Sequence, residues 1–311
     1  MPAHLLFTGR TTVVAVAVSL VACAGGGTDR QPAAVPPNYV AEVEAWREKH
    51  EQDYRREYVT IAGLHFLDPG AHTVGRGPGT DIVLSAHVPP TIGRLSVADG
   101  FVRFEPAPGV PVEHRGKRVT GSVTLKEPGK PAAEELIVGD VRLAIHQSGP
   151  RLSLRVWDPN GEPATAFKGF AWFPIDPSYR VTARFIPDDK PQTLTVLNTF
   201  NDETTYTSEG VVEFELQGRT VRLRPFTTRP RRFYFVLRDA SSGIETYGTG
   251  RFLYSDLLDN GTTVLDFNQA YNPPCAFNPY TTCPIPLKEN IIPVRILAGE
   301  RDYGSQGLRT K

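Results

Sequence analysis

The stretch DFNQAYNPPCAFNPYTTCPIPLKEN, residues 266–290, limits how the second half of this chain can fold. It holds two cysteines, five prolines and four asparagines. Proline fixes φ and lacks a backbone donor, so helix interiors and central strands exclude it at this density. The stretch is therefore predicted to be a loop. Its side chains leave three functions open: a metal site, a catalytic loop, or a loop closed by a disulfide.

The rest of the composition extends this reading to the whole chain of 311 residues. Glycine and proline each occur 28 times, which divides a chain into many short elements and favours β structure. Basic and acidic residues balance at 34 each, so no charge excess predicts a nucleic-acid partner. We predict a mainly β fold, with an N-terminal helix followed by two antiparallel β domains of sandwich-like or barrel-like form.

A helical pattern precedes the β segments, over residues 38–57. Aromatic and apolar residues recur there at spacings of three and four, on one helix face: Tyr39, Val43, Trp46, His50 and Tyr54. Asn38 is a candidate N-cap for this helix. The pattern predicts a helix that packs beside a β domain, rather than one whose aromatics bind a ligand.

Residues 58–160 alternate and turn like a β sandwich. AHTVGRGPGTDIVLS (71–85) is followed by IGRLSVADGFVRFEP (92–106) and LIVGDVRLAIH (136–146). A Gly-Arg pair, an Asp-Ile strand start, a glycine turn and a late Gly-Asp weakly resemble a forkhead-associated domain in this order. Where that family has a serine and a histidine for phosphopeptide binding, this segment has prolines and Ile92. The resemblance implies the sandwich, without phosphothreonine binding.

Residues 161–303 form the second predicted unit. RRFYFVLRD (231–239) is apolar on both faces and is predicted to be a central strand. GVVEFELQGRTVRLRPF (210–226) predicts a hairpin. A two-residue loop with glycine first suits a type II′ turn, so Gly218-Arg219 is the predicted loop. That register sets Glu213 opposite Arg224, where opposite charges pair.

Three segments of this unit together resemble a known family. They are FKGFAWFPIDPSYRVTARF (167–185), RRFYFVLRDASSGIETYGTGRFLY (231–254) and LDFNQAYNPPCAFNPYTTCPIPLKENIIPVRILAGE (265–300). Their order and spacing are similar to the family called domain of unknown function 1684. Phe252 and Leu287 are minor departures from its pattern. The resemblance implies a prokaryotic, often exported protein, and it implies no reaction.

The first residues predict export. An apolar run over 13–22 is shorter than the roughly 20 residues that a membrane span requires, as in a signal peptide over residues 1–22. It ends in LVAC (20–23), which is similar to the lipobox of bacterial lipoproteins. Cys23 is therefore the predicted lipid attachment site, on a flexible tether over 23–37. We expect an exported protein, anchored by this lipid to the periplasmic or outer-surface side of a bacterial membrane, with a short tail over 304–311.

Cysteine and histidine usage narrows the chemistry of the loop. The chain has three cysteines, and with Cys23 lipidated, Cys275 and Cys283 remain as a pair that is predicted to form a disulfide in an exported protein. Such a bond contributes about 2–3 kcal/mol. No histidine lies beyond His146, which excludes a serine-histidine-aspartate arrangement or a histidine-rich zinc site within the second unit. We predict no metal site and no cofactor.

Polar residues gather around the ends of the predicted strands and the loop. Two readings stay open for them: a structural brace of carboxylates, amides and arginines, or a site for a small polar ligand. Alternation puts Asp266 and Asn268 on one face, where the loop begins. The candidate ligand site consists of Arg238, Asp239, Tyr247, Arg251, Asp266, Asn268, Tyr271 and Asn290.

Two functions follow from these observations. The first is a lipid-anchored envelope protein that binds a small polar ligand or an envelope partner without turnover. The second is an envelope hydrolase or transferase that works through carboxylates. The sequence names no catalytic residue, because the second unit has neither a histidine nor a nucleophile motif.

Overall fold

The computed structural model describes residues 35–84, 87–132 and 135–306. The predicted signal peptide (1–22) and Cys23 lie outside these residues. The N-terminal helix is α1 (Tyr39–Tyr54), which continues into a π-helix, η1 (Arg55–Val59). The predicted stripe forms its inner face, with Tyr39, Val43, His50 and Tyr54 buried.

The predicted cap of this helix is wrong. The Asn38 side chain makes no capping hydrogen bond, because its backbone (φ −102°, ψ 18°) lies outside the extended region that an N-cap adopts. The first turn is instead closed by backbone bonds, from Tyr39 N–H to the Pro36 carbonyl at 3.1 Å and from Glu42 N–H to the Asn38 carbonyl at 3.0 Å.

The segment after α1 folds into two sheets. Their strands are β1 (Ile61–Phe66), β2 (Gly70–Gly75), β3 (Ile82–Val83), β4 (Gly93–Ala98), β5 (Phe101–Pro106), β6 (Glu113–His114), β7 (Lys117–Arg118), β8 (Val123–Lys126), β9 (Leu136–Val138), β10 (Val141–Ser148) and β11 (Arg151–Trp157). One sheet has the order β1-β11-β10-β9-β6-β7, and the other β3-β2-β4-β5-β8. Alternate residues of both sheets, including Leu95, Phe104, Leu143 and Leu154, form one apolar core.

A short helix, α2 (Glu162–Ala166), leads into the second set of sheets. Its strands are β12 (Arg180–Leu197), β13 (Glu203–Leu216), β14 (Arg219–Leu223), β15 (Phe226–Arg229), β16 (Arg232–Leu237), β17 (Arg251–Asp256) and β18 (Thr262–Asp266). They form the sheets β14-β13-β12-β18 and β15-β16-β17, which share a second core. As predicted, β16 is a central strand, with residues 233–237 all buried. The fold is mainly β with an N-terminal helix, and all four sheets among the described residues are open.

The predicted hairpin forms as β13 and β14, but with a different loop. Gln217 and Gly218 both have positive φ, 52° and 73°, so the turn is of type I′, which matches the twist of the flanking strands. Glu213 therefore faces Arg222 rather than Arg224. The pairing shifts by two residues, an even number, so every side chain keeps its predicted face.

The proline-rich stretch is a loop, as predicted, with single turns of 3-10 helix: η3 (Phe267–Gln269), η4 (Pro274–Ala276) and η5 (Lys288–Asn290). Another such turn, η2 (Pro177–Tyr179), precedes β12, and η6 (Tyr303–Gln306) ends the described chain. We call residues 267–290 the cysteine loop. Asn278 ties it to the start of β1, by hydrogen bonds of 2.9 Å and 2.8 Å to the Tyr58 and Ile61 carbonyls.

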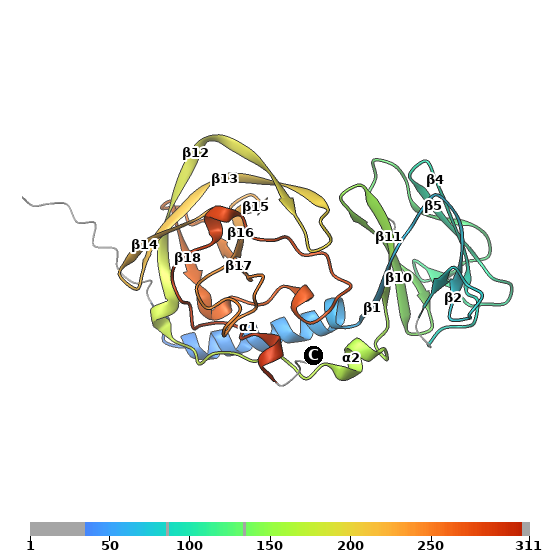
Figure 1. Cartoon of the computed structure of the whole chain (residues 1–311), viewed down its shortest axis with the longest axis horizontal. Helices are drawn as coiled ribbons and strands as arrows, with labels where there is room; N and C mark the ends of the chain where they lie inside the picture. The colour runs from blue at the N-terminus through green and yellow to red at the C-terminus, as the bar shows by residue number, and fades with distance from the viewer. Residues whose placement is uncertain (1–34, 85–86, 133–134, 307–311) are drawn as a thin grey trace, which may run out of the picture. The chain divides into compact units, whose positions relative to one another are not determined.

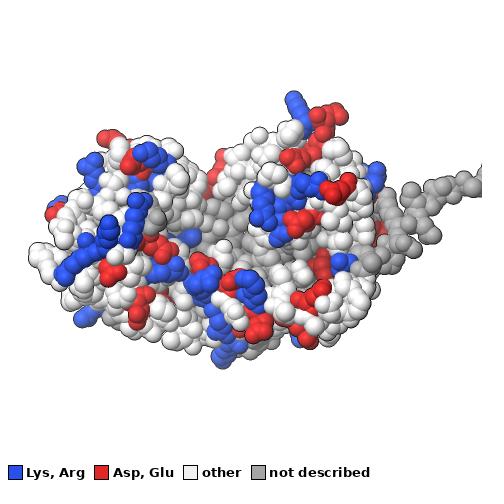
Figure 2. Space-filling model, turned by 180° about the vertical axis from the view of Figure 1, so that it is seen from behind, with Lys and Arg blue, Asp and Glu red and all other residues white. Residues whose placement is uncertain are grey.

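Helix α1 packs against the C-terminal strands and the cysteine loop, although the first two sheets separate them in sequence (Figure 1). Arg47 donates to the carbonyls of Phe173 and Asn268, each at 3.1 Å. The Tyr39 hydroxyl donates to Asp266 at 2.9 Å. Figure 2 shows basic and acidic side chains interspersed over the described part of the face it displays. None of the helices in the described ranges is long and apolar enough to cross a membrane.

Candidate functional site

The eight residues of the predicted site lie in separate places. Arg251 and Asp239 form an ion pair inside the protein, with Arg251 Nη2 donating to Asp239 Oδ2 at 2.8 Å and both side chains no more than 1% exposed. Arg251 also donates to the carbonyls of Ala298 and, at 3.0 Å, Ile296. The second oxygen of Asp239 accepts from the Ile296 N–H at 3.1 Å. This pair clamps the C-terminal segment to β17 and has no surface for a ligand.

Three other predicted residues also lie away from any shared cavity. Asn290 is buried and bridges the backbone carbonyls of Arg224 and Val236, at 2.9 Å and 3.0 Å. The Arg238 side chain is exposed. Tyr247 donates its hydroxyl to the Cys275 carbonyl at 3.3 Å, and burial raises the pKa of Tyr247 to about 12.

The two cysteines lie next to each other and are unlinked. The Cys275 N–H donates to Cys283 Sγ at 3.4 Å. Their mutual hydrogen bond raises the pKa of the Cys275 thiol and lowers that of Cys283. The two cysteines are therefore adjacent within the cysteine loop, and the disulfide between them stays a prediction.

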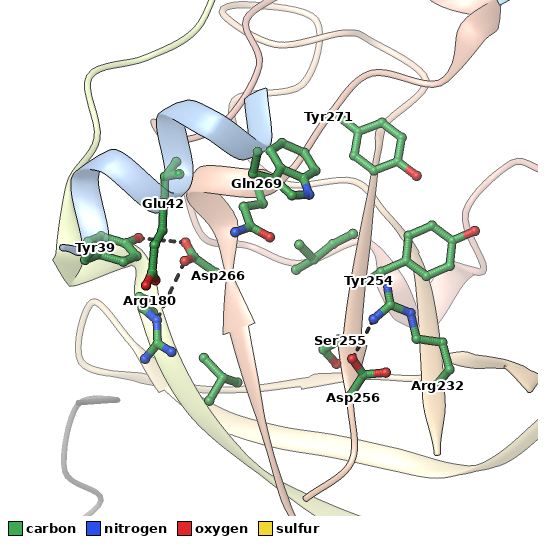
Figure 3. Close-up of a pocket in the computed structure, with 14 residues that line it drawn as sticks. Tyr39, Glu42, Arg180, Arg232, Tyr254, Ser255, Asp256, Asp266, Gln269 and Tyr271 are labelled. Carbon is green, nitrogen blue, oxygen red and sulfur yellow. Dashed lines mark hydrogen bonds and ion pairs between the residues drawn. The ribbon is translucent and has the colours of Figure 1, made fainter. Parts of the chain in front are cut away.

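The remaining three predicted residues do meet, at a pocket between α1 and the strands β17 and β18 (Figure 3). Asp266 and Tyr271 line it, and Asn268 lies directly behind, donating its amide to the Tyr39 hydroxyl at 2.9 Å. The cavity has a volume of about 380 Å³. Its wall consists of Tyr39, Glu42, Val43, Trp46, Arg180, Arg232, Leu253, Tyr254, Ser255, Asp256, Val264, Asp266, Gln269 and Tyr271. We call this cavity the α1 pocket.

Two arginine–carboxylate pairs stand on opposite sides of the drawn pocket in Figure 3. Arg232 Nη1 lies 2.6 Å from Asp256 Oδ2, on neighbouring strands that the ladder pairs directly. Arg180 Nε lies 3.7 Å from Asp266 Oδ2, also across a paired ladder position. The pairing of the strands therefore sets one carboxylate opposite each arginine. As a result, the pocket wall carries both positive and negative charges.

The Asp266 carboxyl is the most enclosed acid of this pocket. Burial raises its pKa, although hydrogen bonds from Tyr39 and Asn268 and the charge of Arg180 act in the opposite direction. Burial and the neighbouring Asp266 charge also raise the pKa of Tyr39. At neutral pH the Tyr39 hydroxyl is therefore a donor to Asp266, and this bond fixes the first turn of α1 against the end of β18.

Aromatic rings form the other part of the wall. Tyr271 lies 6.2 Å from Trp46, and Arg232 lies over the Tyr254 ring at 5.1 Å. Behind them stands His50, stacked on Trp46 at 4.9 Å and 4.5 Å from the Tyr271 ring. The Nε2 atom of His50 is buried with no hydrogen-bond partner in the described part of the chain, and burial lowers the pKa of His50 to about 4, so it is neutral at pH 7. This packing holds Trp46 and Tyr271 in place.

Comparison with known proteins identifies part of the chain. Residues 165–301 match the model of a family described as "Protein of unknown function (DUF1684)". The C-terminal half of the chain belongs to the DUF1684 family. Among the curated proteins, no match was found.

One solved structure with similarity to this chain is the solution NMR structure of the uncharacterized protein from gene locus rrnAC0354 of Haloarcula marismortui. It shares 32% sequence identity with this chain, and the match covers 45% of this chain and 80% of that one, with a TM-score of 0.38. The forkhead-associated resemblance of residues 58–160 stays a prediction.

The α1 pocket is shared between the DUF1684 region and the helix outside it. Arg180, Arg232 and Asp256 come from DUF1684 strands, whereas Tyr39, Glu42, Val43 and Trp46 come from α1. Sequence analysis missed most of these residues. The aromatic stripe of α1 was the one available signal, since it indicated which face is buried. Within the described ranges, no group of three or more His, Cys, Asp or Glu side chains is placed to hold a metal ion.

Proposed function

We propose that this protein binds a small, uncharged, hydroxyl-rich molecule, such as a simple sugar, in the α1 pocket. The observation that carries this is the composition of the wall, which combines aromatic rings with two arginine–carboxylate pairs. Ligand pockets typically combine apolar surface with a few placed polar groups, in cavities of about 300–1,000 Å³. The α1 pocket, at about 380 Å³, matches a ligand at the small end of that range.

The charge of the wall supports an uncharged ligand. Two arginines and three carboxylates line the cavity, which leaves it near balance. A strong anion would have to displace Asp256 from Arg232 or Asp266 from Arg180, and a strong cation would compete with the arginines. Hydroxyl groups both donate and accept, so they can satisfy a carboxylate and a guanidinium together.

The aromatic rings support a ligand with an apolar face. Trp46, Tyr254 and Tyr271 all line the pocket, Trp46 and Tyr254 as partly exposed rings and Tyr271 as a buried one. A sugar ring has C–H groups on one face that pack against an aromatic ring, while its hydroxyls point outward to polar side chains. The amide of Gln269, which lies between the two charged pairs in Figure 3, adds a donor and an acceptor.

A second part of the proposal concerns the cellular location of the protein. We infer that the chain is exported and anchored by lipid at Cys23, and that Cys275 and Cys283 form a disulfide in that oxidising setting. The signal-like run over 13–22 and the LVAC sequence support this. Mass spectrometry of the mature N-terminus from the native host should find a lipidated Cys23. An unmodified N-terminus at another residue would refute the anchoring.

One observation favours a carboxylate-dependent hydrolase as a second candidate. Burial raises the pKa of Asp266, and a second carboxylate, Asp256, lines the same pocket. Glycoside hydrolysis typically uses two carboxyl groups, one of which has a raised pKa and acts as the general acid. Product analysis after incubation with oligosaccharides separates the two functions, since binding alone leaves the ligand intact.

A panel of three ligand classes tests the binding proposal. Neutral mono- and disaccharides, zwitterionic amino acids and small organic anions are each titrated against the full chain, with melting temperature and tryptophan fluorescence as readouts. We expect a saturable response to a neutral sugar. A response confined to the anions or the zwitterions would contradict an uncharged ligand.

A further inference from the structure

A second cavity lies where the first set of sheets meets the cysteine loop. Along β10 and β11, core residues alternate with residues on the opposite face of the sheet, among them His146 and Arg155. The loop covers this outer face, with Thr282 Oγ1 3.0 Å from His146 Nε2. Beside it, Arg151 Nη2 holds Asp202 at 2.7 Å. These contacts enclose a space between the sheet and the loop.

The walls of this second cavity contain no carboxylate. It has a volume of about 200 Å³ and is lined by Tyr58, His146, Arg155, Tyr234, Phe252, Pro274, Thr281, Thr282, Cys283 and Pro284. Its polar lining consists of hydroxyl groups, one guanidinium, one imidazole and one thiol, and aromatic and proline rings complete the wall. This composition is the reverse of the α1 pocket, where every arginine has an acid beside it.

Arg155 supplies the guanidinium among the residues that line this cavity. Its Nε is buried with no hydrogen-bond partner, and the side chain makes no hydrogen bond or ion pair to any residue in the described ranges. Its guanidinium carbon lies over the Trp157 ring, 5.9 Å from the ring centroid. Ala144 lies opposite Arg155 in the ladder and offers no polar group. Burying a guanidinium N–H group without an acceptor costs stability, and an anion in the cavity would remove this cost.

We propose that this cavity binds a small oxyanion, a phosphate or a short carboxylate, with Arg155 as its charged partner. The planar guanidinium offers paired N–H donors that match two oxygens of either group. The hydroxyls of Thr281 and Thr282 line the same cavity and can donate to further oxygens. A volume of about 200 Å³ restricts the ligand to a few heavy atoms.

The protonation states support a single positive charge in the cavity. Burial, together with the charge of Arg155, lowers the pKa of His146 to about 4, so this imidazole is neutral at pH 7 and is free to donate or accept through one nitrogen. Arg155 keeps its charge, as arginines in proteins do, although burial lowers its pKa. The site is thus suited to one anionic group.

The Cys283 thiol offers a competing explanation for the unpaired arginine. It lines the same cavity, and the charge of Arg155 is one of the causes that lower its pKa. A thiolate at Cys283 would then be the counter-charge of Arg155, and no external anion would be required. A Cys275–Cys283 disulfide removes this possibility, so the test is made with and without a reductant.

The test titrates sodium phosphate and sodium acetate separately into the full chain, at constant ionic strength in a buffer with a bulky sulfonate as counter-ion. Melting temperature and the NMR signal of the Arg155 Nε–H group report binding. We expect a saturable response to at least one anion. Arg155→Gln should weaken it by roughly tenfold or more, as for a lost hydrogen bond to a charged group. Because Arg155 makes no hydrogen bond to a side chain or carbonyl within the described ranges, this variant should fold normally.

Two further variants complete the experiment. Arg94→Gln removes an exposed arginine on β4, outside the cavity, and should bind like the wild type. Arg155→Lys keeps the charge without the planar fork and should bind more weakly than the wild type. An unchanged affinity in Arg155→Gln or Arg155→Lys would overturn the proposal. The absence of saturable binding in the wild type would also overturn it, and a raised thiol pKa of Cys283 in Arg155→Gln would then assign Arg155 to the thiolate.

Discussion

The indole of Trp46 lies 6.2 Å, centroid to centroid, from the phenol ring of Tyr271, so the first helix and the cysteine loop share one aromatic cluster. Helix α1 is outside the matched DUF1684 residues, 165–301, yet it closes a pocket on their surface. The pocket is therefore a property of the helix and the DUF1684 region together.

The first prediction concerns this docking. Trp46→Ala should lower the free energy of unfolding by about 2 kcal/mol, below the range for a fully buried aromatic because Trp46 is half-buried. Denaturant unfolding measures the change. The matched control is Lys49→Ala on the same helix, whose side chain is 73% exposed and which should change stability little. Equal stability of the two variants would show that Trp46 does not hold the helix in place.

The second prediction compares two arginines of the sequence-predicted site. Arg251→Ala leaves the Asp239 carboxylate buried without its cation and should cost about 3–5 kcal/mol of stability. Arg238→Ala removes an exposed side chain and should be nearly neutral. Chemical denaturation of both variants tests this. An Arg251→Ala protein as stable as the wild type would contradict a stabilising role for the Arg251–Asp239 ion pair.

These two arginines show where the sequence stops being informative. The pattern RRFYFVLRD correctly indicated a buried central strand, because apolar residues on both faces have few alternatives. It could not show which arginine is buried, since that depends on segments remote in sequence, such as the Ala298 and Ile296 carbonyls that bind Arg251. The sequence-based prediction assigned Arg238 and Arg251 to one site because both are arginines near predicted strand ends.

The same limit applies to local and tertiary structure elsewhere. The alternation of the hairpin fixed its faces, but positive φ at Gln217 moved the loop by one position. The stripe of α1 showed which face is buried and not what covers it. Asp266 and Tyr271 were predicted for the site and line the pocket, whereas Arg180 and Arg232 reach it through strand pairing that no local pattern indicates.

The third prediction is a pH dependence. Burial lowers the pKa of His50 from 6.5 to about 4, so the unfolded chain binds this proton at a higher pH than the folded chain. The stability that His50 contributes is complete above pH 6.5 and is lost as the pH falls towards 4, to an extent on the order of 3 kcal/mol. His50→Phe keeps an aromatic ring and removes the titration. Its unfolding free energy should fall less than that of the wild type between these pH values, and parallel curves would refute the assignment.

The fourth prediction concerns Cys275 and Cys283. Protein isolated from an oxidising compartment should give the two peptides linked in a non-reducing digest, because the side chains are adjacent in the loop. Cys275→Ser, Cys283→Ser and reductant should each abolish the linked peptide. Complete alkylation of both thiols in native, unreduced protein would show that the loop keeps its shape without the bond.

The central claim, a ligand in the α1 pocket, is tested most directly by comparing two exposed aspartates. Asp256 pairs with Arg232 in the pocket wall, and Asp259 pairs with the neighbouring Arg231 outside it. Both Asp256→Asn and Asp259→Asn should fold like the wild type, because the two side chains are 59% and 100% exposed. Isothermal titration of the best neutral sugar from the panel should show affinity reduced by roughly tenfold in Asp256→Asn, as for a lost charged hydrogen bond, and unchanged in Asp259→Asn. Equal affinity in the two variants would contradict a ligand bound in this pocket.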